Sequence, residues 1–239
     1  MPVVGDICIR PDDIQLLVPP NWINDQVIAA AFELLPSEVG SAVDREGWLC
    51  VGPSEAFMMA QIADAGQLRA LFAPLRLQER ALILLPVCDH DDPESAGGLH
   101  WSLLAFYRHQ GVPACYHFDS LGHCNNAPAR RLAARLGSVL GIKDLPFVAA
   151  PTPQQANGHD CGMYAIYISR LCVRSLGMSP EEVSERIGRE ATPEAITEHR
   201  RALIRELRRL VEADEAAGKP GRDPARGRAR AEAPAAAPA

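Results

Sequence analysis

One segment of the sequence is apolar on nearly every side of a helix. Residues 163–172 read MYAIYISRLC, and they follow directly on a polar loop that ends in Asp160-Cys161-Gly162. A helix without a polar face has to be buried, so other elements of the fold must enclose it. The pattern therefore predicts a helix at the centre of a core, with Cys161 in its first turn.

Cysteine at this position is a candidate nucleophile. The first turn of a helix carries unpaired backbone N–H groups and the positive end of the helix dipole, and both favour an anion. A thiol there ionises more readily, and the thiolate is the reactive form. We expect Gly162 to leave room for an approaching substrate. Buried cysteines are commonly inert, so the role of Cys161 depends on partners elsewhere in the chain.

A histidine and a carboxylate are candidates for those partners. Two strand-like runs, residues 100–108 and 115–120, flank a short polar turn that contains Gly111. With the turn at residues 109–110, His100 lies directly opposite Asp119, and with the turn at 110–111 the two are diagonal neighbours. Both registers place an imidazole and a carboxylate on one face. A carboxylate fixes the tautomer of a histidine and raises its basicity, as a general base for a thiol requires.

Other elements follow from periodicity and capping residues. A helix with Asn24 as its N-cap is expected to end at Pro36, and a helix with Asn126 as its N-cap is expected to end at Gly141. Ser179-Pro180-Glu181-Glu182 has the pattern of a capping box at a helix start. We expect further strands at residues 47–52, 80–88 and 145–150, and further helices at 54–64, 67–73 and from 193 to about 213.

Composition separates the chain into two parts. Residues 1–213 have the apolar content of a globular domain, whereas residues 214–239 are rich in Ala, Pro and Arg and are predicted to be a disordered tail. The net charge is −6; from Gly218 onward five Lys and Arg against two acids give +3, which leaves −9 for the body. An acidic body does not favour nucleic acid as a partner and suits a basic protein surface.

Cellular context follows from what the sequence contains. Seven cysteines without a CxxC pair suit a reducing compartment, and the N-terminus MPVVGDICIRPDD has no signal-peptide pattern. No apolar run approaches the roughly 18 residues of a membrane span. We therefore expect a soluble cytoplasmic or nuclear protein that does not bind membranes. Cys115, His117, His123 and Cys124 match no zinc spacing, so no metal site is expected.

The motifs together resemble a known family. Matching segments are PPNWINDQVIAAAFELL, GGLHWSLL, YHFDSLG, PTPQQANGHDCGMY and TPEAIT, which span residue 3 to about 211. The chain resembles cysteine proteases of the Ulp/sentrin-specific family, which remove ubiquitin-like modifiers, and most closely the deneddylase branch. The resemblance implies an α+β, papain-like fold of the Ulp type. In that fold the nucleophile begins a buried helix, and the His and Asp lie on an antiparallel sheet.

The resemblance also implies roles for individual residues. Cys161 would be the nucleophile, His100 its base, Asp119 the residue that orients the base, and Gln155 a donor to the oxyanion. The family uses tryptophans at the positions of Trp22 and Trp101 to wall a narrow tunnel for Gly-Gly, and Asp25 would pair with a basic residue of the modifier. No cofactor is implied. Three residues depart from the usual family pattern: Ile23, Phe118 and His159.

Several functions fit the resemblance. The first is processing of the neddylation (Rub) modifier precursor or its removal from conjugates such as cullins, by a monomeric enzyme. The second is the same chemistry on the sumoylation modifier or on ubiquitin. The third is acyl transfer to a small substrate, which the tunnel tryptophans do not favour. The fourth is inactive binding of ubiquitin-like proteins, which the four filled catalytic positions do not favour.

Overall fold

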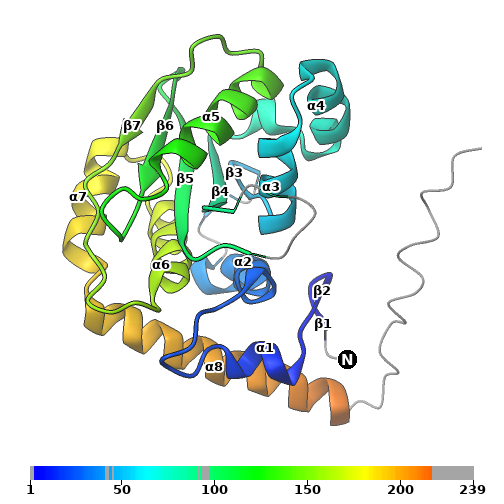
Figure 1. Ribbon diagram of the computed structural model, residues 1–239, viewed down its shortest axis with the longest axis vertical. Helices are drawn as coiled ribbons and strands as arrows, with labels where there is room; N and C mark the ends of the chain where they lie inside the picture. Colours follow the sequence, from blue (N-terminus) through cyan, green and yellow to red (C-terminus); the bar gives the residue numbers. More distant parts are fainter. Residues whose placement is uncertain (1–2, 41–42, 45, 91, 93–96, 217–239) are drawn as a thin grey trace, which may run out of the picture.

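A five-stranded sheet with helices on both faces forms the framework of the protein (Figure 1). The computed structural model describes residues 3–40, 43–44, 46–90, 92 and 97–216. The strands follow the order β3-β4-β5-β6-β7 across the sheet. Their bounds are β3 Trp48–Cys50, β4 Leu82–Cys88, β5 Trp101–His109, β6 Val112–Phe118 and β7 Phe147–Ala149.

The sheet is mixed. β4, β5 and β6 pair antiparallel, whereas β3 is parallel to β4 and β7 is parallel to β6. The predicted antiparallel sheet is therefore correct for the three central strands, which carry the candidate His and Asp at their ends. The outer strands are parallel because each connects to its neighbour through helices instead of a hairpin.

The register of the β5–β6 hairpin is the second of the two alternatives. His109 pairs with Val112, so Gln110 and Gly111 form the turn, and both have positive φ, at 48° and 81°. Two consecutive residues with positive φ make the type of turn that matches the twist of a hairpin. His100 and Asp119 therefore lie diagonally across from each other, each one residue outside its strand.

Two cores lie on opposite faces of the sheet. Along β4 the side chains alternate, so Leu82 and Leu84 enter one core while Ile83 and Leu85 enter the other. Helices α2 (Asp25–Val39) and α6 (Cys161–Arg174) cover the first face. Helices α3 (Pro53–Gln61), α4 (Ala65–Phe72) and α5 (Asn126–Leu140) cover the second.

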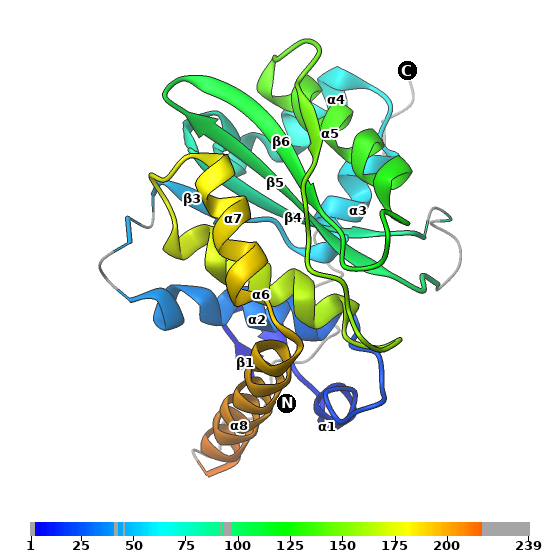
Figure 2. The same cartoon turned by 90° about the vertical axis from the view of Figure 1, so that its left-hand side faces the viewer.

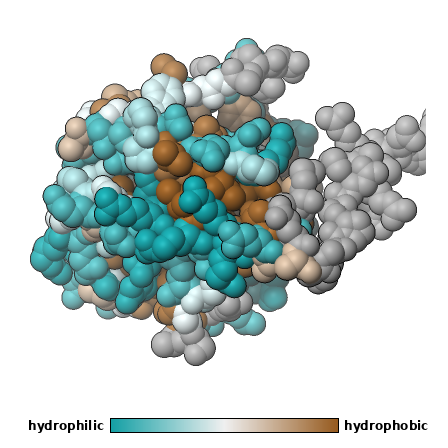
Figure 3. Space-filling view, turned by 90° about the horizontal axis from the view of Figure 1, so that it is seen from below, coloured by the Kyte–Doolittle hydropathy of each residue, from teal (hydrophilic) through white to brown (hydrophobic). Residues whose placement is uncertain are grey.

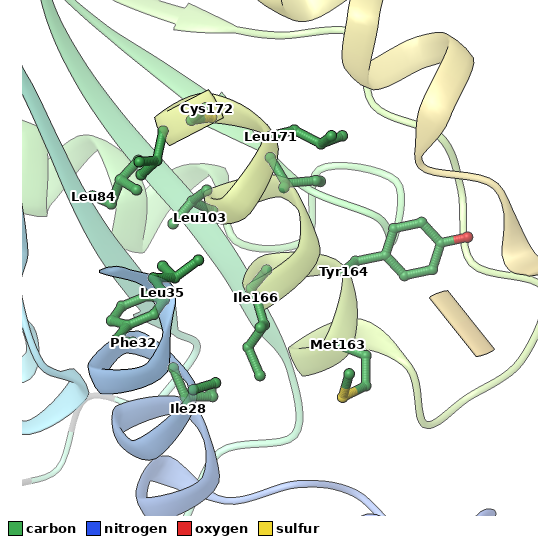
Figure 4. Close-up of a cluster of buried hydrophobic side chains, with 14 of the residues drawn as sticks. Ile28, Phe32, Leu35, Leu84, Leu103, Met163, Tyr164, Ile166, Leu171 and Cys172 are labelled. Atoms are coloured by element: carbon green, nitrogen blue, oxygen red, sulfur yellow. The ribbon is translucent and has the colours of Figure 1, made fainter. Parts of the chain in front are cut away.

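Helix α6 is enclosed on nearly all sides, as its composition predicts. It packs against β5 and α2, and α7 (Pro180–Glu190) and α8 (Pro193–Ala216) cover the remainder (Figure 2). Figure 4 shows Met163, Ile166 and Cys172 of α6 among side chains of α2 and the sheet, including Phe32, Leu84 and Leu103. The nucleophile candidate thus begins the most enclosed helix of the domain.

Helix ends agree with the sequence pattern in part. The side chain of Asn24 caps α2, and Ser179 and Glu182 form the predicted capping box of α7. Pro36 does not end α2, which continues to Val39 and stops at Gly40 with φ 76°. Proline removes one N–H donor, and here the helix tolerates the loss in its last turn. Asn125, one residue before the predicted cap, occupies the N-cap position of α5 without a side-chain capping bond, and Gly141 ends the helix.

The C-terminal helix α8 is longer than expected and runs along the bottom of the molecule in Figure 1. It continues to Ala216, so residues 214–216 of the predicted tail are helical, and the remainder of that tail lies outside the described residues. Seen from below, this side is mostly hydrophilic, with hydrophobic residues visible in one central area (Figure 3). Pairs such as Arg205–Glu198 and Arg209–Glu206 lie on its exposed face.

Short elements complete the N-terminal part. β1 (Val3–Val4) and β2 (Ile7–Cys8) form a two-stranded sheet, and α1 (Pro11–Gln15) follows. Two 3-10 turns, η1 (Ala73–Leu75) and η2 (Leu77–Glu79), connect α4 to β4. Among the helices of the described residues, none has the length and hydrophobicity needed to cross a membrane.

Truncation of Ile166 tests the importance of this enclosure. The side chain is 1% exposed, so Ile166→Ala leaves a cavity and should lower the free energy of unfolding by about 2–5 kcal/mol. Val112, on β6, is 68% exposed, and Val112→Ala should change it by less than about 0.5 kcal/mol. Urea unfolding of both variants measures the difference. Equal effects would contradict the central position of α6.

Candidate active site

Cys161 lies where the sequence places it, at the first residue of α6, and is 5% exposed. Gly162 has a different role from the expected one. A Cβ added there would lie 2.5 Å from Cγ1 of Ile23 and 3.5 Å from Cδ1 of Trp101. The space next to Cys161 is therefore filled by Ile23, and glycine lets the segments that carry Trp22 and Trp101 pack against the nucleophile helix.

His100 and Asp119 form a buried pair. Nε2 of His100 donates to Oδ1 of Asp119 at 2.6 Å, and the two side chains are 4% and 0% exposed. The carboxylate also accepts from the backbone N–H groups of Leu121 and Asn125, each at 2.9 Å. With Nε2 held in this way, the other ring nitrogen, Nδ1, is buried and makes no hydrogen bond in this geometry. Cys161 is close enough to contribute to the raised pKa of His100, so Nδ1 is the nitrogen available to its sulfur.

The contact between His100 and Asp119 shifts the pKa of both side chains. Burial lowers the pKa of His100, but the hydrogen bond with Asp119 and the interaction with Cys161 outweigh it and raise the pKa to about 9. Burial raises the pKa of Asp119, and the hydrogen bonds from His100 and two backbone N–H groups more than compensate, so its pKa is lowered. At neutral pH His100 is therefore an imidazolium between the carboxylate of Asp119 and Cys161, and the proton at Nδ1 is the one that the cysteine gives up when the thiolate forms.

Asn125 holds this pair in place, and the sequence pattern did not identify it. It is fully buried, and its backbone N–H bonds Asp119 while its side-chain Nδ2 donates to the carbonyls of Val87 and His100, both at 3.2 Å. One residue thus links the ends of β4, β5 and β6. The available signal was its place directly before a helix start, which was assigned to Asn126 instead.

His117 shares the face of the pair but has a structural role. Its Nδ1 contacts Oδ1 of Asn126 and its Nε2 contacts Oγ of Ser102, both at 2.9 Å. Burial lowers the pKa of His117, so the ring is neutral at physiological pH. The amide oxygen accepts, so Nδ1 carries the proton and Nε2 accepts from Ser102.

Gln155 lies on the loop that leads to the nucleophile. Its Oε1 accepts from Ser120 at 2.9 Å, and its Nε2 donates to the carbonyl of Asn157 at 2.7 Å. These bonds fix the amide between the end of β6 and the turn before Cys161. An amide nitrogen carries two hydrogens, so Nε2 can donate to Asn157 and to an oxyanion together.

A buried arginine anchors the same loop. Arg200 on α8 is 2% exposed, and its Nη2 and Nε donate to Oδ1 of Asp160 at 2.7 and 3.1 Å. It also donates to the carbonyls of His159 and Leu17. Leu17 lies five residues before Trp22, so one guanidinium ties the tryptophan segment to the residue preceding Cys161. No local sequence signal marks this contact.

The three predicted binding residues line one groove. Trp22, Asp25 and Trp101 surround a space of about 500 Å³ together with Phe57 of α3 and Cys88 at the end of β4. Trp22 is 47% exposed, so its side chain is accessible at the wall of the groove. Within the described residues no three His, Cys, Asp or Glu side chains gather to hold a metal ion.

Comparisons with known proteins agree on one family. Residues 74–182 match the Ulp1 protease family, C-terminal catalytic domain. Sentrin-specific protease 8 of Rattus norvegicus is 32% identical over 199 residues, covering 82% of this chain and 88% of that protein. NEDD8-specific protease 1 of Arabidopsis thaliana is 30% identical, covering 86% and 91%.

A solved structure agrees on the fold. The crystal structure of a de-sumoylating protease superposes with a TM-score of 0.66 at 17% identity, covering 87% of this chain and 88% of that one.

Alkylation tests whether Cys161 is activated. Burial raises the pKa of Cys88 to about 11 and those of Cys115 and Cys172 to about 12. His100 stays cationic up to about pH 9 and supports a thiolate below that pH. Iodoacetamide at pH 6 should therefore label Cys161 first, as peptide mass spectrometry can show. His100→Ala should remove this advantage, and equal labelling of all cysteines would argue against an activated thiol.

Removal of the buried guanidinium of Arg200 should destabilise the protein. Arg200→Met leaves the carboxylate of Asp160 buried without its cation, which should lower the free energy of unfolding by about 3–5 kcal/mol. Arg201 is the matched control, because its side chain is 66% exposed and pairs with Glu198 at 3.7 Å. Arg201→Met should cost less than about 1 kcal/mol. Urea unfolding measures both, and similar values would refute an anchoring role.

Proposed function

The chain belongs to the Ulp1 protease family and is a cysteine protease, and we propose that it cleaves after the C-terminal Gly-Gly of the neddylation modifier. The relative named NEDD8-specific protease 1 supports this choice of modifier. Cullin conjugates are the proposed targets, and we expect a monomeric enzyme in the cytoplasm or nucleus.

The observation that carries the catalytic proposal is the 2.6 Å bond between His100 and Asp119 beside the start of α6. Asp119 holds the Nε2–H of His100, so Nδ1 takes the proton from Sγ of Cys161. The thiolate attacks the carbonyl of the terminal glycine and a tetrahedral oxyanion forms. The backbone N–H of Cys161 and Nε2 of Gln155 stabilise that oxyanion.

Collapse of the intermediate completes acylation. The bond to the leaving amine breaks, His100 returns its proton to that amine, and a thioester joins the modifier to Cys161. Water, deprotonated by His100, then attacks the thioester and releases the modifier with a free carboxylate. All groups required for these steps belong to the chain itself, and the proposed mechanism uses no cofactor.

The groove accounts for the requirement for glycine. Trp22 and Trp101 are large planar side chains on two segments that Gly162 brings together. A narrow passage between them accepts residues without side chains. Discrimination between modifiers then depends on residues before the Gly-Gly, which meet Asp25 and the acidic body of the protein.

A panel of fluorogenic C-terminal amides tests the choice of modifier. The neddylation modifier should be cleaved with a kcat/KM at least ~100-fold above that of ubiquitin, a difference of about 2.7 kcal/mol in transition-state binding. The sumoylation modifier should be poorer still. Cys161→Ala should abolish hydrolysis and keep binding of the modifier. Equal kcat/KM for the sumoylation modifier would overturn the choice of modifier and leave the protease activity in place.

The oxyanion role of Gln155 has its own kinetic signature. Gln155→Ala should lower kcat by roughly 10²–10³ with little change in KM, because an oxyanion donor acts mainly in the transition state. Steady-state kinetics on the best amide provides the measurement. A large rise in KM at unchanged kcat would instead identify Gln155 as a substrate-binding residue.

A further inference from the structure

A second groove, separate from the one lined by the tryptophans, lies between the sheet and α7. It encloses about 640 Å³, and Tyr116, Val148, Pro151 and Pro153 form its apolar wall. Its floor follows β7, the edge strand of the sheet, and the segment that leaves it. We call it the α7 groove. An extended peptide can lie along such an edge with its apolar side chains against the wall.

The opposite wall of the α7 groove is acidic. Glu181, Ser184, Glu185 and Gly188 of α7 contribute to it, and the described residues that line the groove include no Lys or Arg. The hydroxyl of Tyr116 donates to Oε1 of Glu181 at 2.8 Å, and this bond lowers the pKa of that carboxyl. In the described part of the chain, two acidic side chains and no basic one line this wall, so the groove favours a ligand with basic side chains.

The α7 groove leads to the catalytic residues. Its wall at Pro151–Pro153 continues directly into Gln155, and Oγ1 of Thr152 accepts from the backbone N–H of Asp119 at 3.2 Å. The tryptophan groove lies on the other side of α6. In Figure 1, α7 and β7 lie to the left of α6, whereas α2 and α3 lie to its right. A substrate that enters past Trp22 and Trp101 and reacts at Cys161 continues toward the α7 groove.

We propose that the α7 groove binds the polypeptide on the leaving-group side of the scissile bond, as an extended segment with basic and apolar residues. This inference rests on the proposed protease function. It adds a second determinant of specificity, because the modifier is selected on one side of Cys161 and the attached chain on the other. Precursor extensions and conjugated proteins with Lys or Arg near the bond are then preferred.

The test compares substrates with and without a polypeptide leaving group. Modifier precursors carry equal-length extensions, one of alternating Leu and Arg and one of alternating Leu and Glu, and the fluorogenic amide carries none. Wild type should cleave the basic extension with a kcat/KM at least ~10-fold above the acidic one. Glu185→Lys should reduce this ratio to about 1 and leave hydrolysis of the amide within about twofold. Glu212→Lys makes the same charge change on the exposed face of α8 and should preserve the ratio.

A binding measurement separates failure of the groove from failure of the proposed function. A fluorescein-labelled decapeptide of alternating Leu and Arg should bind Cys161→Ala protein, as judged by anisotropy, and Glu185→Lys should weaken binding at least ~10-fold. If the amide is not cleaved but this binding holds, the proposed function fails, while the preference of the α7 groove for basic peptides is retained. Absence of both the peptide binding and the preference for the basic extension would overturn the proposal that the α7 groove binds the leaving polypeptide.

One alternative occupant is part of the chain itself. Residues 217–239 contain five Lys and Arg and could fill the same groove. A chain that ends at Ala216 decides between them. If it binds the peptide at least ~10-fold tighter than the full chain does, the occupant is the basic tail, and the assignment to substrate is overturned. Unchanged affinity supports the substrate.

Discussion

The enclosure of α6 is the constraint on which the rest of the structure depends. A helix with apolar residues on every side cannot stand at a surface, so the sheet, α2, α7 and α8 are arranged around it. The only part of α6 that needs to be reached is its first residue. The packing of the whole first core thus places Cys161 and gives its sulfur a rigid position beside His100. The same buried helix also supplies the first-turn N–H groups that favour a thiolate.

Two buried carboxylates near Cys161 would disfavour a thiolate if each were not paired with a cation. Asp119, which is bonded to His100, and Asp160, which precedes Cys161 in the chain, are both buried carboxylates, and nearby negative charge opposes formation of a thiolate. Asp119 is compensated by the imidazolium of His100 and by two backbone N–H groups, while Asp160 is compensated by Arg200. The surroundings of the thiol therefore approach neutrality although the protein carries a net charge of −6.

Local sequence patterns were sufficient for much of this arrangement. Apolar periodicity predicted α6, and alternation on two strands predicted that His100 and Asp119 share a face, although the register needed the turn at Gln110-Gly111 to be resolved. Asn125 and Arg200 were missed because their partners are remote in sequence, and the purpose of Gly162 depended on contact with Ile23 from the N-terminal part. Pro36 illustrates the opposite case. Proline predicted the end of the helix, but the packing of α2 lets it continue to Val39.

Arg200 follows Asp160 by 40 residues, while another of its acceptors, Leu17, precedes it by 183. During synthesis at about 5–20 residues per second, Cys161 leaves the ribosome roughly 2–8 s before Arg200 does. A nascent chain in that interval contains Cys161 but not the guanidinium that holds the preceding loop. The loop can therefore acquire its buried anchor only after α8 has been synthesised as far as Arg200.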